Sequence, residues 1–207
     1  MTSPGRPDCW HSRRTAPWAG GMRVTGVRLI EAEQAPLLAR PYYANGDPGP
    51  IVAALAHVPE LLEVTMPFLG AALGPSAVDA RAKELVILRT SVRQGCRYCV
   101  QAHTVVARDT GLSRAEVAAL RGQQPLEAAF TNPRELALLR WVDVVAVGSG
   151  PVPEAARRAA RAQLGEADLV ELTLLVGATL LLNRFCTALD LPTSPAVLRR
   201  LAEEGWP

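Results

Sequence analysis

Two cysteines, Cys96 and Cys99, stand three positions apart near the middle of the chain, and His103 follows one helical turn later. Two thiols at this spacing can close into a disulfide, because the start of a helix brings them within the short separation that the bond requires. A histidine four residues beyond the second thiol can accept its proton. These three residues therefore predict a redox-active dithiol with a base beside it.

The elements that must position these groups are two helices joined at Gly95. Residues 81–94 contain no Pro or Gly and repeat apolar side chains at helical spacing. Gly95 ends this helix, because glycine accepts the left-handed conformation of many helix C-termini, and a second helical pattern runs from Cys96 to about Asp109. The unpaired N–H groups and dipole of a helix N-terminus lower a thiol pKa from about 8.5 to roughly 3.5–7.5. We therefore expect the pair to react at neutral pH, with Cys99 attacking first, because His103 lies one turn away and a positioned base outweighs the helix dipole at Cys96.

One face of the second helix carries all three groups. Cys96, Cys99 and His103 fall within an arc of about 60°, and Cys99 and His103 form an i, i+4 pair, so that the imidazole can take the thiol proton. Glu84 lies near the start of the first helix, with eleven residues between it and Cys96. If the two helices pack antiparallel, its carboxylate approaches His103 and orients the ring or relays its proton.

The pattern Glu-x11-Cys-x2-Cys-x3-His, formed by Glu84, Cys96, Cys99 and His103, resembles the signature of the alkylhydroperoxidase D branch of the carboxymuconolactone decarboxylase-like family. All four signature positions match. The resemblance implies an all-helical, usually oligomeric protein that uses no metal or haem. It also implies that Cys99 attacks the peroxide, that Cys96 resolves the oxidised cysteine, and that Glu84 and His103 relay protons.

The resemblance is strongest over residues 78–111 and weaker over residues 50–192. It departs at Tyr98, where the alkylhydroperoxidase D proteins have a histidine. A tyrosine with a pKa of about 10 cannot shuttle protons near neutral pH, so the relay of this chain lacks one member. Decarboxylases of the family lack the cysteine pair, and the resemblance therefore indicates peroxide chemistry.

The function implied is that of a thiol-dependent peroxidase with a dithiol–disulfide cycle. Its expected partners are a hydroperoxide substrate, an external dithiol or lipoyl-type electron donor, and further copies of the same chain. Two other functions stay open. One is a thiol–disulfide oxidoreductase that uses the same cysteines without peroxide, and the other is a non-enzymatic helical module that binds zinc or senses redox state.

Two structural interpretations of the motif also stay open. Cys96, Cys99 and His103 could be three ligands of a zinc site, although zinc needs a fourth ligand. The two cysteines could instead be small buried apolar residues.

Composition and charge favour a compact helical protein. The 207 residues can bury one sizeable core, and 49% hydrophobic with 5% aromatic residues suits helices packed with Leu, Val and Ala. A net charge of +2 with scattered basic residues predicts no binding to nucleic acid or to a membrane. Four cysteines are too few for a disulfide scaffold, and a Cys-x-x-Cys pair without a secretion signal indicates the reducing cytoplasm.

Residues 1–21 contain several Pro and Gly and no apolar run long enough for a signal peptide, so we expect a disordered extension there. Translation could start at Met22, which would leave Cys9 and His11 without a role. Residues 22–207 are expected to form a single all-α domain.

Further helices are predicted over residues 51–73 with a break at Pro59, from a capping box at residues 113–116, and over residues 133–147, 153–164, 166–189 and 195–204. The apolar run 172–182 is shorter than the roughly 20 residues of a membrane span and indicates a core helix. Aligning Asp168 with Glu84 matches several apolar positions, which suggests a duplicated helical hairpin with only the first copy catalytic. Cys186 has no partner in that alignment and is predicted to lie in the core.

Overall fold

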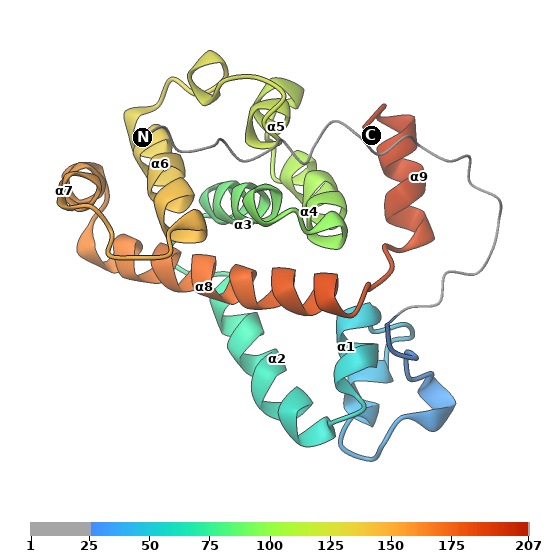
Figure 1. Cartoon of the computed structure of the whole chain (residues 1–207). Coiled ribbons are helices and arrows are strands. Elements are labelled where there is room, and N and C mark those ends of the chain that lie inside the picture. Colours follow the sequence, from blue (N-terminus) through green and yellow to red (C-terminus); the bar gives the residue numbers. More distant parts are fainter. Residues whose placement is uncertain (1–25, 207) are drawn as a thin grey trace, which may run out of the picture.

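The computed structural model describes residues 26–206, which form an all-helical protein without a β-strand in that range (Figure 1). The all-α prediction is confirmed. The expected disorder of residues 1–21, with Cys9 and His11, lies outside the described residues. The α-helices are α1 (Pro50–Leu55), α2 (Pro59–Leu73), α3 (Ala80–Gln94), α4 (Arg97–Asp109), α5 (Arg114–Leu120), α6 (Pro133–Val147), α7 (Glu154–Gln163), α8 (Glu166–Ala188) and α9 (Pro195–Glu203). Short 3-10 helices lie at Ala32–Gln34, Arg40–Tyr43 and Leu126–Ala128.

The helix boundaries follow from capping residues. The side chain of Asp79 accepts a first-turn backbone N–H of α3 at 2.7 Å. Gly95 ends α3 in the left-handed conformation, with φ of 65°, and so lets the chain turn directly into α4. Ser113 and Glu116 form the predicted capping box of α5, and Asn132 caps α6 as predicted.

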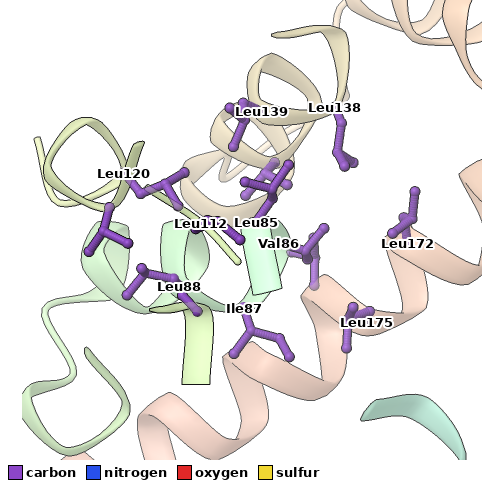
Figure 2. Close-up of a cluster of buried hydrophobic side chains, with 14 of the residues drawn as sticks. Leu85, Val86, Ile87, Leu88, Leu112, Leu120, Leu138, Leu139, Leu172 and Leu175 are labelled. Carbon is purple, nitrogen blue, oxygen red and sulfur yellow. The ribbon is translucent and has the colours of Figure 1, made fainter. Parts of the chain in front are cut away.

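α3 is the central helix of the fold (Figure 1). It packs against α4, α6 and α8, and every residue from Lys83 to Ser91 is buried. Figure 2 shows its apolar side chains between the leucines of α6 and α8. The buried polar groups of such a helix need partners. Arg89 has one in Asp143 of α6, to which its guanidinium donates two hydrogen bonds of 2.7 Å.

α8 runs unbroken past α2, α3, α4 and α6 (Figure 1). By length and composition alone it could cross a membrane. Its packing against α2, α3, α4, α6 and α7 and its buried leucines, such as Leu172 and Leu175, instead make it a core helix of this structure. This agrees with the interpretation of the apolar run.

The predicted duplication of the helical hairpin is wrong. The alignment of Asp168 with Glu84 places the counterpart of Gly95 at Thr179, in the middle of α8. Thr179 continues the helix, and its hydroxyl donates to the Leu175 carbonyl within the same helix at 2.8 Å. Without a residue that accepts a left-handed conformation, the second segment does not turn back on itself.

α9 packs against α4, the helix that follows Cys96, and Arg200 joins it to Asp109 at the end of α4. Leu201 points into the core, whereas Leu198 of the same helix is 43% exposed. We expect Leu201→Ala to lower the free energy of unfolding by about 2–5 kcal/mol, because it leaves a cavity in the core. Leu198→Ala should cost about 0.5 kcal/mol or less. Urea denaturation of both variants measures the difference, and equal losses would contradict this packing of α9.

Candidate active site

The α3–α4 hairpin brings Glu84 and His103 together. Because α4 folds back along α3 after Gly95, the two carboxylate oxygens of Glu84 lie 3.0 and 3.3 Å from Nδ1 of His103. Glu84 is buried, and 22% of the His103 side chain is exposed. The contact expected from an antiparallel hairpin is confirmed. A carboxylate at Nδ1 places the ring proton there and leaves Nε2 to exchange protons.

Proton transfer directly from a thiol to His103 was expected from the i, i+4 spacing. In the described part of the chain, both hydrogen bonds of the His103 ring run to Glu84, and none joins the ring to Cys99 or Cys96. The zinc interpretation needs the same ring beside the sulfurs. Over residues 26–206, no three His, Cys, Asp or Glu side chains are grouped so as to hold a metal ion.

The two motif cysteines lie side by side at the start of α4. Their Sγ atoms are 2.8 Å apart, which is longer than the disulfide length of about 2.05 Å, and both are free thiols. Cys96 is the N-cap of α4, and its sulfur accepts the Cys99 N–H at 3.4 Å. The predicted place of Cys96 at a helix N-terminus is confirmed. Both side chains are buried.

A third cysteine meets this pair from α8. Cys186 lies in the same buried cluster as Cys96 and Cys99, and its thiol favours ionisation of both. The same part of α8 carries Thr187, which favours ionisation of Cys96, and Asn183, which favours ionisation of Cys99. The prediction that Cys186 is buried is confirmed, but its contacts with the motif were missed.

A sequence signal for these contacts existed. Asn183, Cys186 and Thr187 have i, i+3, i+4 spacing and share one face of a helix whose other residues are mainly apolar. Polar groups on one face of a buried helix need a partner, which here is the dithiol.

The three thiols do not share charge equally. Hydrogen bonds with Cys186 and Cys99 outweigh the effect of burial and lower the pKa of Cys96 to about 3. For Cys99, the hydrogen bond with Cys186 favours ionisation, but the hydrogen bond with Cys96 and burial raise its pKa to about 12. Hydrogen bonds with Cys96 and Cys99 raise the pKa of Cys186. These shifts favour ionisation of Cys96 over ionisation of the other two thiols.

Tyr98 lies beside the cysteines. Burial is the main cause that raises the pKa of Tyr98 to about 12, and the neighbouring cysteines raise it further. Its hydroxyl thus keeps its proton across the physiological range, as the sequence comparison at this position led us to expect.

An apolar cavity of about 440 Å³ adjoins the sulfur cluster. Four of its lining residues, Val27, Ala54, Phe185 and Leu189, also pack in the cluster that contains the three cysteines. None of the residues that line this cavity is a cysteine, so the cavity lies beside the sulfur cluster without opening onto a thiol.

The fold is that of known alkylhydroperoxidase-like proteins. A protein of unknown function from Agrobacterium tumefaciens, suggested to be the antioxidant defence protein AhpD, is 26% identical, with 68% of this chain and 95% of that chain covered and a TM-score of 0.61. An uncharacterized peroxidase-related protein from Silicibacter sp. TM1040 has a TM-score of 0.74 at 19% identity, over 87% of this chain and 97% of that one. The debrominase Bmp8 has a TM-score of 0.70 at 20% identity, over 89% and 99% of the two chains.

These similarities define a class of helical proteins with an alkylhydroperoxidase D-like fold. The model of the carboxymuconolactone decarboxylase family matches residues 59–144, which include Glu84, both motif cysteines and His103. Over these residues the chain is similar to this family.

The lowered pKa of Cys96 predicts a dependence of stability on pH. Between its folded value of about 3 and its usual value of 9.0, the unfolded chain carries a proton on Cys96 that the folded protein lacks. Stability from this group therefore rises with pH across that window and is lost as pH falls toward 3. Above pH 9 the sign reverses, because the folded protein keeps the Cys99 proton that the unfolded chain releases.

We expect urea denaturation to show a stability difference between the wild type and Cys96→Ser that grows from pH 4 to pH 8. The ultraviolet absorbance of the reduced protein should show one thiolate per chain at neutral pH, which Cys96→Ser removes. Cys186→Ser keeps a hydroxyl donor and serves as the control, with the thiolate retained. A wild-type thiolate that titrates near pH 9 would contradict this charge distribution.

Proposed function

We propose that this protein is a thiol-dependent peroxidase that reduces hydroperoxides through a dithiol–disulfide cycle. The observation that carries the proposal is the pair of free cysteines whose Sγ atoms lie 2.8 Å apart, one of them at a helix N-terminus. A thiolate attacks the peroxide bond, and a second thiol at this distance can close a disulfide with little movement. The fold shared with an antioxidant-type protein supports the same chemistry.

In the first step, Cys96 Sγ attacks one peroxide oxygen, the O–O bond breaks, and the leaving alkoxide or hydroxide takes a proton. Cys96 becomes a sulfenic acid. The Cys99 thiol then attacks the Cys96 sulfur, water leaves, and the disulfide forms. An external dithiol reduces that disulfide through a mixed disulfide and is itself oxidised. The resemblance assigns the first attack to Cys99, whereas the hydrogen bonds of the reduced site favour Cys96.

Glu84 and His103 relay protons in this proposal. The carboxylate holds the ring through Nδ1, so Nε2 can give a proton to the leaving oxygen or receive one from solvent at its exposed edge. We assign proton transfer to Glu84 and His103 and not to Tyr98, because Tyr98 keeps its proton.

Conditions inside the cytoplasm suit this cycle, since it needs a reducing dithiol pool. The electron donor we propose is a dithiol of lipoyl type, an apolar group that can enter the cavity lined by Phe185 and Leu189.

Reductive debromination is a second candidate. The debrominase Bmp8 shares the fold, and a cysteine-to-alanine variant of it has been solved with 2,3,4-tribromopyrrole. Removing bromide from an apolar aromatic ring would use the same two electrons and leave the same disulfide, and the apolar cavity beside the thiols favours such a substrate.

Steady-state assays with a panel of dithiols, including dihydrolipoamide, decide between these candidates. Peroxide consumption supports the peroxidase, and bromide release from 2,3,4-tribromopyrrole supports the debrominase. Disulfide exchange without either activity would leave a thiol–disulfide oxidoreductase and overturn the proposal.

We expect Glu84→Gln and His103→Gln each to slow peroxide reduction about 10²-fold near neutral pH, the typical cost of losing a general acid or base. Glu127→Gln, at an exposed carboxylate that pairs with Arg140, is the control and should leave the rate unchanged. Circular dichroism checks that the variants fold. Wild-type rates for both site variants would return Glu84 and His103 to a structural role.

We also propose that the chain forms a homo-oligomer. Two helices that pack together, α2 and α8, expose large apolar side chains at helical spacing, namely Leu61, Val64 and Phe68 of α2 and Val170, Leu174 and Leu181 of α8. Apolar area of this kind is usually covered by another chain.

Leu174→Asp should therefore shift the sedimentation coefficient toward that of a monomer, because it places a charge in the proposed contact. Leu198→Asp alters a leucine of similar exposure on α9 and should leave the oligomer intact. A monomeric wild type in analytical ultracentrifugation would contradict the proposal.

A further inference from the structure

Cys186 has no role in the two-cysteine cycle, yet it lies at its centre. Only 2% of its surface is exposed, and it contacts both Cys96 and Cys99. Many buried cysteines are simply small apolar core residues. Here, however, the three cysteines among residues 26–206 all lie in a single cluster, although α8 is far from the motif in sequence.

Several polar contacts hold the end of α8 against the start of α4. Asp190, just beyond α8, pairs with Arg97 at 2.9 Å, and Arg97 directly follows Cys96. Thr193 donates to Gln101 of α4 at 2.7 Å. The two backbone segments that carry Cys96 and Cys186 are therefore fixed relative to each other.

Asn183 fixes the same side of α8 one turn earlier. Its amide nitrogen donates to the Ser91 hydroxyl of α3 at 3.0 Å. The face of α8 that carries Cys186 is thus held toward the dithiol from both sides.

We propose that Cys186 is a second disulfide partner of Cys96, which competes with Cys99 for the oxidised sulfur. The role of Cys186 in resolving the oxidised Cys96 rests on the proposed function. The Cys186 thiol attacks the Cys96 sulfenic acid, an S–S bond forms, the S–O bond breaks, and the hydroxyl leaves with the thiol proton as water. Both cysteines end at the oxidation level of a disulfide, and no other reactant is consumed.

The two disulfides differ in what they connect. Cys96–Cys99 closes a ring within the start of α4, whereas Cys96–Cys186 links α4 covalently to α8. The second bond closes a loop of about 90 residues, which is predicted to add stability of its own by restricting the unfolded chain. The oxidised protein should therefore contain two populations that share Cys96.

The test uses Cys99→Ser, which removes the first partner with a nearly isosteric side chain. The reduced variant is treated with one equivalent of hydroperoxide and, separately, with diamide, which forms disulfides without peroxide chemistry. After an acid quench and alkylation under denaturing conditions, peptide mapping should find a Cys96–Cys186 disulfide with either oxidant. The double variant Cys99→Ser/Cys186→Ser should form no disulfide within the chain and should give a Cys96 sulfenic acid that dimedone traps after peroxide.

The proposal is overturned if Cys186 of Cys99→Ser remains fully alkylatable after diamide, or if Cys96 pairs with Cys9 instead. The helical circular dichroism signal of each variant confirms its fold. The experiment with diamide tests the disulfide partner separately from the proposed peroxidase function. A Cys96–Cys186 disulfide in a protein that consumes no peroxide overturns the peroxidase and leaves the second partner standing.

Discussion

A charged sulfur inside a helical protein is stable only where hydrogen-bond donors replace water. For Cys96 these donors come from two elements far apart in sequence. The start of α4 supplies the Cys99 N–H and thiol, and the end of α8 supplies Cys186 and Thr187. The placement of α8 follows from this need for donors near Cys96. The end of α8 reaches the cysteine pair because α8 is one long helix that packs across α3 (Figure 1).

The position of Glu84 depends on the burial of α3. Packed on all sides, α3 cannot rotate without exposing Leu85 and Leu88 or forcing a polar group against the core. The hydrogen bonds between Glu84 and His103, and between Arg89 and Asp143, join α3 to its neighbours, so both contacts resist rotation. The same packing that stabilises the fold holds the carboxylate in place.

Local patterns in the sequence were sufficient for the helices, for the turn at Gly95 and for the contact between Glu84 and His103, because the two residues flank a single tight turn. Local patterns could not predict that α8 brings Cys186 to the cysteine pair. Which face of an apolar helix meets the dithiol depends on packing between distant segments, so Cys186 could be assigned only to the core. The charge distribution between Cys96 and Cys99 also depends on those distant donors. The false duplication arose because leucines at helical spacing align whether or not the chain turns.

Because the chain turns at Gly95, the contact between Glu84 and His103 depends on the number of residues on each side of this glycine. Glu84 lies eleven positions before this glycine and His103 eight positions after it, which correspond to about three turns of one helix and a little over two of the next. Each added residue would rotate everything beyond it by about 100°. An insertion in either arm of the hairpin would thus turn one partner away from the other, even with every side chain kept. The exposed 148–153 loop can accept extra residues without moving a sulfur, whereas the hairpin tolerates no change in length.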